Sequence, residues 1–383
     1  MQRHLRIALV LETSGGGSGR HVLDLARGLI TDGHDVTVIW SPDRARQDFM
    51  DGLRSLASVT TIKVDMHRSV GLNDLASVRE LALAIEARAP FDVLHAHSSK
   101  AGALVRLVPR RIPGVRIYTP HAFRTMDPDL KEPMRSVYSM IERLLSERGS
   151  QIITVSQAEY DHARSIGIGD HLLSTVVNGV DLPRGATRAA ARCEMGLDPD
   201  TVAIGFVGRL DPQKDPLRFV QAIQAAAQKA PKLIGVVIGD GPLLEDAERV
   251  ASPEGRMRFM GWQDGPRLML GLDVFCMTSV YEAMPYTLLE AVHAGLPIVA
   301  TDIGGANETI VEGKNGHIVP LDCTPEDLGA CLATFAKDRP KRARFGESSL
   351  HMARARTVAA MVAQTVQVYE RALSEVSVLA RVS

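Results

Sequence analysis

The sequence has few cysteines, few aromatic residues and almost no net charge. Its four cysteines are scattered and none forms a Cys-x-x-Cys pair, which argues against zinc and disulfide frameworks. The 44 basic and 45 acidic residues give a net charge of −1, so bulk electrostatics does not indicate nucleic acid binding. We expect reduced thiols in a cytoplasmic protein.

Long apolar runs are also missing. The first run, at 7–11, ends at Glu12 and is too short for the core of a signal peptide. No uninterrupted apolar stretch approaches the roughly 20 residues that span a bilayer. Any contact with the inner face of a membrane is therefore expected to be peripheral.

The chain does have length and a regular alternation of elements. Its 383 residues, 45% of them hydrophobic, are enough for two domains with separate cores. Short β-branched runs alternate with segments of helical period, which is typical of parallel sheets covered by helices. Strands are predicted at 6–11, 35–40, 60–64, 91–96, 115–119, 151–155 and 175–177, and then at 202–207, 233–238, 256–260, 274–278, 297–300 and 317–319.

Turn residues at 178–183 and a stretch without strands up to about 200 mark the predicted linker. We therefore predict two doubly wound α/β domains, at 1–181 and 182–357. A last helix, from about 358 to 383, has no strand after it, and we expect it to pack back on the first domain.

A glycine-rich run follows the first predicted strand and includes Gly16 and Gly17. Glycine lets the backbone approach a ligand, and the N-terminus of the next helix offers N–H groups to an anion. The spacing does not match G-x-G-x-x-G, so a dinucleotide fingerprint is not met. A contact with a phosphate or polar acceptor and a plain flexible turn both remain open.

The strongest signal follows the strand predicted at 202–207. Gly-Arg-Leu occupies 208–210, and Lys214 stands five positions after Arg209. Ligands bind at the carboxyl ends of strands in open α/β sheets, and a guanidinium with an ammonium suits a diphosphate. The alternative is a pair of solvated surface cations.

Two glutamates, Glu282 and Glu290, flank a segment in which Pro285 is expected near the start of a helix. Both carboxylates can then face one site, and an anion there would meet the backbone amides of Tyr286, Thr287 and Leu288. Alternatively, one glutamate is stabilised by the helix dipole near the N-terminus of the helix, and the other faces solvent. The surroundings of Glu290 are almost all apolar, so that it needs a partner.

These motifs together resemble the family 4 retaining glycosyltransferases of the GT-B fold, also called group 1. The resemblance rests on 208–214, on the Glu-x7-Glu segment at 282–290, on the Gly-Gly pair at 304–305 and on the Asn-Gly-Val-Asp turn at 178–181. It implies two Rossmann-like domains that face a central cleft and hold a nucleotide sugar.

The resemblance also implies roles for individual residues. Arg209 and Lys214 would hold the donor diphosphate, Glu290 the ribose and Glu282 the transferred sugar. The loop at Gly16 and Gly17 would close over the phosphates.

His121, after the strand predicted at 115–119, matches the active-site histidine of this family. The implied role is a hydrogen bond to the donor sugar, and the plain alternative is a structural histidine at a strand end. His95 and His97 lie on the same face of a predicted strand with no obvious third ligand, so we assign no metal to them.

The Asp-x-Asp spacing of metal-dependent transferases occurs at 127–129 and 198–200, each time around a proline, and we interpret both as turns or caps. We therefore predict no metal and no cofactor, with the nucleotide sugar as co-substrate. Arg209, Lys214 and helix amides would then stabilise the leaving diphosphate. Retention of configuration rests on the resemblance alone.

The acceptor and the donor base are less well indicated. Ten basic against five acidic residues at 100–148 favour an anionic lipid surface, or are ordinary solvated helix faces. The segment at 97–102 resembles that of transferases in bacterial surface-polysaccharide assembly. Asp264 would accept from a guanine, and a uracil read by backbone groups is equally compatible, so a UDP- or GDP-sugar is expected.

Two other functions remain as alternatives. A sugar-nucleotide epimerase or hydrolase would share the fold, although an epimerase is not expected to carry the arrangement of Glu282 and Glu290. A non-catalytic nucleotide-sugar-binding module would keep the phosphate contacts but lose the sugar contacts, and both Glu282 and His121 are present.

Overall fold

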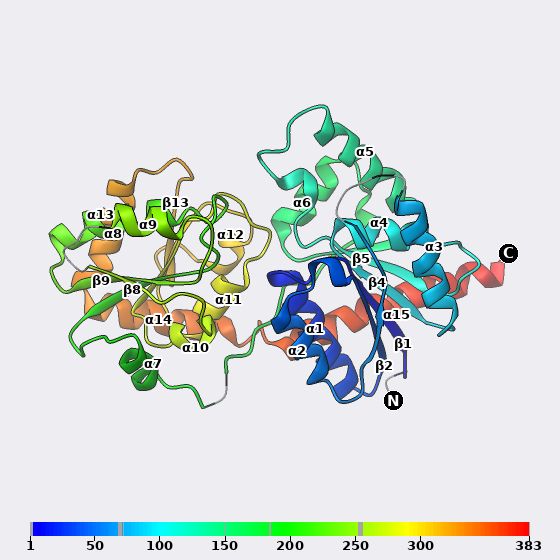
Figure 1. Cartoon of the computed structure of the whole chain (residues 1–383), viewed down its shortest axis with the longest axis horizontal. Helices are drawn as coiled ribbons and strands as arrows, with labels where there is room; N and C mark the ends of the chain where they lie inside the picture. Colours follow the sequence, from blue (N-terminus) through cyan, green and yellow to red (C-terminus); the bar gives the residue numbers. More distant parts are fainter. Residues whose placement is uncertain are drawn as a thin grey trace. The chain divides into compact units, whose positions relative to one another are not determined.

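The computed structural model describes residues 3–67, 71, 73–148, 150–183, 185–251 and 256–382, and the chain divides into two units. The first unit combines Met1–Asn178 with Val358–Ser383, and the second is Gly179–Thr357. Each unit is a parallel sheet between layers of helices (Figure 1).

The sheet of the first unit has seven strands within the described residues, in the order β3-β2-β1-β4-β5-β6-β7. The strands are β1 (Arg6–Leu11), β2 (Asp35–Trp40), β3 (Thr60–Lys63), β4 (Val93–His97), β5 (Val115–Thr119), β6 (Ser150–Thr154) and β7 (Leu173–Thr175). Strand order reverses beside β1, where Leu11 is opposite both Trp40 of β2 and His97 of β4. The carboxyl ends of β1, β4 and β5 therefore lie next to one another.

Helices cover both faces of this sheet. They are α1 (Gly17–Thr31), α2 (Gln47–Arg54), α3 (Asn73–Glu86), α4 (Ser99–Leu107), α5 (Met134–Ser146), α6 (Gln157–Ser165) and α15 (Val358–Val382). Alternate residues of β1 enter different cores, because side chains alternate along a strand. Leu9 packs in the core with α1, α2 and α15, whereas Val10 packs in the core with α3 and α4.

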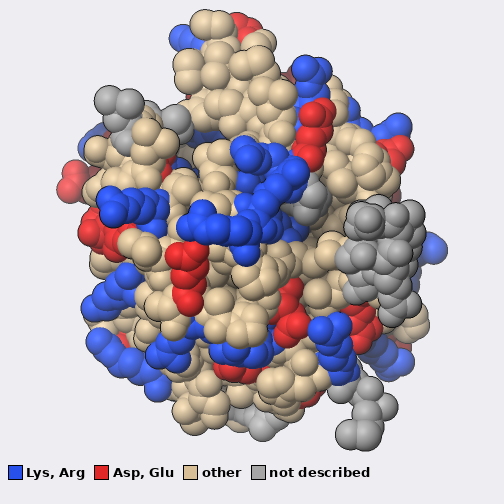
Figure 2. All heavy atoms as spheres, turned by 90° about the vertical axis from the view of Figure 1, so that its right-hand side faces the viewer, with Lys and Arg blue, Asp and Glu red and all other residues tan. Residues whose placement is uncertain are grey.

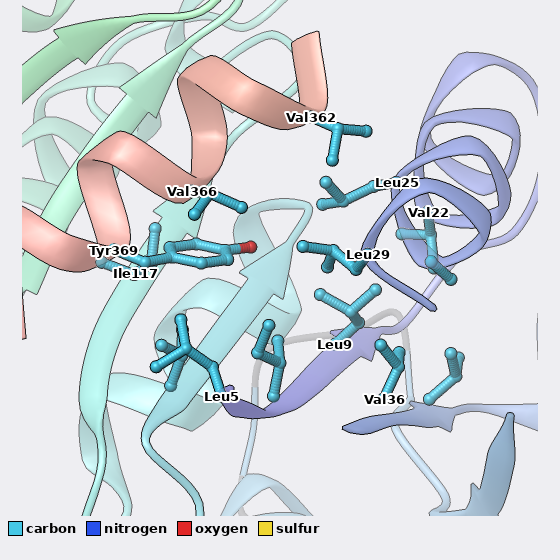
Figure 3. Close-up of a cluster of buried hydrophobic side chains, with 14 of the residues drawn as sticks. Leu5, Leu9, Val22, Leu25, Leu29, Val36, Ile117, Val362, Val366 and Tyr369 are labelled. Atoms are coloured by element: carbon cyan, nitrogen blue, oxygen red, sulfur yellow. The ribbon is translucent and has the colours of Figure 1, made fainter. Parts of the chain in front are cut away.

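Helix α15 completes the first core from the far end of the chain. Val362, Val366 and Tyr369 point into the cluster that Leu25 and Leu29 of α1 also enter (Figure 3). The two helices approach closely at Gly28, where a Cβ would lie 2.4 Å from a methyl carbon of Val362. The first unit is therefore built from both ends of the sequence.

The second unit repeats the architecture with six strands in its described part, in the order β10-β9-β8-β11-β12-β13. The strands are β8 (Val202–Val207), β9 (Leu233–Ile238), β10 (Met257–Phe259), β11 (Val274–Met277), β12 (Ile298–Thr301) and β13 (Gly316–Val319). The helices are α7 (Arg188–Glu194), α8 (Pro216–Lys229), α9 (Leu244–Val250), α10 (Gly265–Met269), α11 (Tyr286–His293), α12 (Ala306–Thr309), α13 (Pro325–Lys337) and α14 (Arg339–Ala353).

The predicted doubly wound α/β fold is confirmed, and the observed strand bounds differ from the predicted ones by two residues at most. The strand predicted at 175–177 is observed at Leu173–Thr175, because β7 pairs with β6 in a register that places Leu173 opposite Ile152. Similarly, α11 begins one residue after Pro285, which is its N-cap. None of the helices in the described ranges combines the length and apolar character that crossing a bilayer demands.

Candidate active site

A buried carboxylate organises the loop that follows β8. The guanidinium Nε of Arg209 donates to Oδ2 of Asp211 at 2.8 Å, and Oδ1 of Asp211 accepts from the backbone N–H of Lys214 at 3.1 Å. Asp211 itself is buried, so the loop turns around this side chain. Sequence reasoning missed Asp211, although aspartate is a common turn residue whose side chain accepts from nearby backbone N–H groups.

The ammonium of Lys214 forms an ion pair with the carboxylate of Glu282. This contact joins the two motifs that the sequence singled out separately, one after β8 and the other after β11. Both side chains are mostly buried, which makes their interaction stronger than that of an exposed pair. The structure thus brings Arg209, Lys214 and Glu282 to neighbouring loops at the carboxyl edge of the second sheet.

Further bonds fasten these loops to each other. The hydroxyl of Thr278 lies 2.9 Å from the carbonyl oxygen of Lys214 and 2.8 Å from that of Asp215. The side-chain amide of Gln213 donates to the carbonyl of Tyr281 at 3.0 Å, and the backbone N–H of Val280 donates to the carbonyl of Gln213 at 2.8 Å. The position of Lys214 relative to Glu282 is therefore fixed by the backbone as well as by charge.

Glycines allow the backbones at this edge to touch. A Cβ on Gly239, which follows β9, would lie 1.9 Å from the carbonyl oxygen of Gly208. A Cβ on Gly304 would lie 2.2 Å from the carbonyl oxygen of Glu282. Any larger residue at either position would force the two loops apart.

Helix α11 carries the other residues predicted from the Glu-x7-Glu segment. Glu290 is buried on it, as are Tyr286 and Leu288. The backbone N–H of Leu288 donates to the carbonyl of Pro285 at 3.1 Å, so this amide is not free as expected, and its contact with an anion stays a prediction. The reason is the tight first turn of the helix, which uses the amide internally.

Two hydroxyls at the same edge have no hydrogen-bond partner among the described residues. They are Oγ1 of Thr287, in the first turn of α11, and Oγ of Ser279, just after β11. Both hydroxyls are buried. A buried hydroxyl without a partner destabilises the folded state unless a ligand or water forms a hydrogen bond with it. Thr287 was predicted from sequence to contact the donor, whereas Ser279 was not singled out.

Asp264 is the N-cap residue of α10, where it has a local partner. Its carboxylate caps the helix by accepting from the backbone N–H of Arg267 at 3.3 Å. This bond uses only part of the acceptor capacity of an ionised carboxylate, which has two oxygens. The predicted contact with a base stays a prediction.

Three histidines meet at the carboxyl edge of the first sheet: His21 of α1, His97 of β4 and His121 after β5. Nδ1 of His97 is 3.1 Å from Nε2 of His121, and Nδ1 of His21 is 3.0 Å from Oδ1 of Asn178. The sheet order β1-β4-β5 brings these elements together. Sequence reasoning did not connect His21 or Asn178 with His121, since no local pattern links them.

These imidazoles are neutral at pH 7. Burial lowers the pKa of His21 to about 4, against a weaker opposing effect of its bond to Asn178. Burial likewise holds the pKa of His97 and of His121 well below the usual value, and neighbouring histidines add to the effect. A neutral imidazole has one donor and one acceptor, so His121 can hydrogen-bond a sugar hydroxyl.

The same cluster is the one group in the described residues with the ligand spacing that a metal ion needs. One nitrogen of each of the three histidines lies within 4.8 Å of the others. His97 thus joins two histidines that the sequence did not link to it, whereas the His95/His97 pair is not part of this group. His95 has a different role, because its ring nitrogens contact the hydroxyl of Tyr369 at 2.7 Å and that of Thr119 at 2.8 Å.

The backbone around His121 is strained, and a buried carboxylate holds it in place. His121 and Ala122 have φ of 56° and 82°, a region that non-glycine residues rarely occupy. The buried carboxylate of Glu159 accepts from the backbone N–H of Ala122 at 2.7 Å and from that of Val155 at 2.8 Å. Glu159 thus ties the turn after β5 to the end of β6, and it was not identified from sequence.

The remaining segments singled out from the sequence are the glycine loop and the two Asp-x-Asp segments. Gly16 has a φ of 71° and immediately precedes α1, which begins at Gly17. In the first Asp-x-Asp segment, Oδ1 of Asp127 accepts from the backbone N–H of Asp129 at 2.9 Å, as in a turn. Asp200, in the second, forms an exposed ion pair with Lys232.

Two family models match separate parts of the sequence. The model of Glycosyltransferase Family 4 matches residues 15–184, and the model of Glycosyl transferases group 1 matches residues 188–352. The first covers most of the N-terminal unit and the second most of the C-terminal unit.

Relatives match over most of the chain. An Escherichia coli protein named UDP-Gal:alpha-D-GlcNAc-diphosphoundecaprenol alpha-1,3-galactosyltransferase is 26% identical over 75% of this chain and 76% of its own length. The phosphatidyl-myo-inositol mannosyltransferase of Mycobacterium tuberculosis is 28% identical over 93% of both. The solved structure of HepE from Anabaena with UDP-glucose has a TM-score of 0.79 at 22% identity, covering 96% of this chain and 100% of that one.

The two tandem parallel sheets, the motifs at their carboxyl edges and the two adjoining family matches agree with one another. The chain belongs to the family 4 glycosyltransferases and has their GT-B fold.

Proposed function

We propose that this protein is a metal-independent, retaining glycosyltransferase. It moves a hexose from a UDP- or GDP-sugar to a hydroxyl of a sugar or lipid-linked acceptor, in the assembly of a bacterial surface polysaccharide or glycolipid. The observation that carries the proposal is the pairing of Lys214 with Glu282 at the carboxyl edge of β8 and β11. Such an edge is where open α/β sheets bind ligands.

The charges at this edge suit a diphosphate leaving group. Arg209 is held by Asp211 with much of its guanidinium exposed, and Lys214 lies on the adjoining loop. A diphosphate that enters here gains both cations without the cost of arranging them, and its growing charge is stabilised as it departs. The unpartnered hydroxyls of Ser279 and Thr287 would complete the contacts of the donor.

Two carboxylates would hold the sugars of the donor. Glu282 keeps its charge partner in Lys214 and is proposed to accept from hydroxyls of the transferred hexose. Glu290, buried on α11, is proposed to accept from the ribose hydroxyls. His121, neutral and fixed by Glu159, is proposed to hydrogen-bond the hexose near its anomeric carbon.

The reaction balances without a cofactor. The bond between the anomeric carbon and the phosphate oxygen breaks, and the acceptor oxygen bonds to the same face of that carbon. The acceptor proton passes to the departing phosphate oxygen. What the protein supplies is position and fixed charge, which together account for large rate enhancements.

The names of the relatives narrow the substrates that we propose. The Escherichia coli relative uses UDP-galactose and a diphosphoundecaprenol acceptor, and the mycobacterial relative acts on phosphatidyl-myo-inositol. A lipid-linked acceptor is therefore proposed first, with UDP-sugars ahead of GDP-sugars. Peripheral association with an anionic membrane follows from such an acceptor.

The test begins with donor binding. Thermal shifts with UDP-galactose, UDP-glucose, GDP-mannose and ADP-glucose identify the donor, since a ligand that binds only the folded state raises the melting temperature. Transfer of the labelled hexose to GlcNAc-diphosphoundecaprenol is then measured with and without EDTA, and NMR of the product reports its anomeric configuration. Donor hydrolysis without transfer, inversion, or loss of activity in EDTA would each overturn part of the proposal.

A further inference from the structure

Helix α5 presents an apolar stripe to solvent. Met134, Val137, Met140 and Leu144 are 45, 37, 50 and 52% exposed. Successive members of this stripe are three or four residues apart, which places them along one side of the helix. Elsewhere in the described residues, exposed large apolar side chains are spread over other helices and loops and do not form such a row.

The opposite side of α5 is anchored firmly, so the stripe has a fixed orientation. Glu142 accepts from the guanidinium of Arg106 at 2.7 Å and from the hydroxyl of Tyr118 at 3.2 Å, in a buried contact. Arg106 also lies 4.3 Å from the ring centre of Tyr118. The only carboxylate on the inner side of α5 is therefore neutralised within the described fold, and the apolar side is the one left outside.

Basic side chains adjoin the stripe at the C-terminal end of α5. Arg143 and Arg148 are exposed there, on either side of one exposed carboxylate, Glu147. Arg116 is close enough to Arg110 and Arg148 that their charges, after the larger effect of burial, lower the pKa of its guanidinium. Figure 2 shows a gathering of Lys and Arg in the middle of one face of the first unit, with fewer charges towards the top, where α5 lies in Figure 1.

We propose that α5 docks on an anionic lipid bilayer, with its apolar stripe between the headgroups and its arginines against lipid phosphates. This inference deepens the proposed function, because it names the segment that would bring the enzyme to a lipid-linked acceptor. An apolar stripe beside basic residues is the pattern of helices that lie in the membrane interface. A second copy of the chain fits less well, since the arginines of two such helices would repel each other.

Co-sedimentation with vesicles tests the proposal on the full chain. Wild type is expected to bind vesicles of phosphatidylglycerol and phosphatidylcholine, and to bind pure phosphatidylcholine weakly. The double variant Met140→Ser/Leu144→Ser is expected to bind the anionic vesicles about tenfold less, because it removes buried apolar area. The matched control Leu75→Ser/Leu83→Ser removes two leucines of α3 that are 75 and 56% exposed, and is expected to bind like wild type.

A second variant separates charge from apolar contact. Arg143→Gln/Arg148→Gln is expected to weaken binding to anionic vesicles and to reduce its sensitivity to salt. Each variant is checked for folding by its melting temperature, and Val137→Ser replaces the double variant if that one unfolds. Equal binding by the α5 variants and wild type would overturn the proposal, as would a wild type that ignores anionic vesicles.

Light scattering and donor binding distinguish the remaining outcomes. If wild type is a dimer that becomes a monomer in Met140→Ser/Leu144→Ser, α5 binds a second copy and the membrane proposal is wrong. If vesicle binding fails while UDP-sugars still raise the melting temperature and transfer proceeds, the proposed function stands without the α5 surface. Vesicle binding without transfer overturns the proposed function alone.

Discussion

The carboxyl edges of the two sheets carry different chemistry. In the first unit, burial lowers the pKa of histidines and favours their neutral form. These histidines contact one another and Asn178. In the second, an arginine and a lysine form ion pairs with carboxylates. The same architecture thus offers neutral hydrogen-bonding groups at one edge and fixed charge at the other, which suits a sugar and a diphosphate respectively.

The largest effect is expected from removing charge at the second edge. Lys214→Ala should lower kcat by about 10²- to 10³-fold, since it removes a fixed cation where the leaving group gains charge. The control Lys232→Ala removes an exposed lysine of the same unit, which pairs with Asp200. Steady-state kinetics with the donor identified above is the measurement, and a Lys214→Ala enzyme with normal kcat would remove the contrast between the edges.

A smaller effect is expected at the neutral edge. His121→Ala should reduce kcat/KM by about 10- to 100-fold, the worth of a hydrogen bond that strengthens in the transition state. The effect should not depend on ionic strength, because no charge is lost. His171→Ala, at an exposed histidine, is the control. A loss as large as that of Lys214→Ala would make His121 more than a hydrogen-bonding group.

Glu159 supports the turn that carries His121, and substituting it tests whether this support matters for activity. Glu159→Gln leaves one backbone N–H, of Ala122 or Val155, facing an amide NH₂ instead of an oxygen. The free energy of unfolding should fall by about 1–3 kcal/mol, the cost of a buried donor without a partner. Activity should fall severalfold through kcat, with donor affinity little changed.

Asp161→Asn, on the exposed side of the same helix, serves as the matched change for Glu159→Gln. Urea unfolding and steady-state kinetics report the two effects separately. If Glu159→Gln lowered stability without lowering kcat, the positive-φ turn at His121 would be a structural feature only.

The buried histidines of the first edge also lead us to predict how the free energy of unfolding depends on pH. At pH 7 they should have almost no effect on it. Because burial lowers the pKa of His21, His95, His97 and His121, the unfolded chain binds protons below about pH 6.5 that the folded chain excludes. The free energy of unfolding should therefore fall as pH falls, by about 2 kcal/mol at pH 5 for each histidine that stays neutral.

Urea unfolding at pH 5, 6 and 7 measures this slope. His95→Gln should make it shallower, whereas His351→Gln, which changes an exposed histidine, should leave it as it is. A stability that rises towards pH 5 would show that the cluster accepts protons in the folded state, and the contrast between the two edges would then be lost.

Much of the fold could be predicted because its signals are local. Each strand is a short β-branched run between turn residues, and the cations after β8 stand at a strand end that sequence alone can locate. The bounds of β7 could not be found in this way, because pairing with β6 decides them. Family resemblance added roles for Lys214 and Glu282 that composition could not have given.

The supporting residues of the site were out of reach of sequence for a different reason. His21 meets His97 only because β1 and β4 are neighbours in the sheet, and Glu159 reaches Ala122 across 37 positions. Neither contact has a local pattern. Asp211 and Thr278 follow recognised strands, but neither belongs to a spacing that marks it as part of a site.

The return of α15 to the first unit has a consequence for synthesis on the ribosome. The β1 strand and α1 are made early, yet the apolar cluster around Leu29 is closed only when Val366 and Tyr369 arrive. The second unit, whose residues are contiguous, can complete its core before then. The half of the enzyme translated first therefore matures last, and it remains exposed to proteases and chaperones for longer.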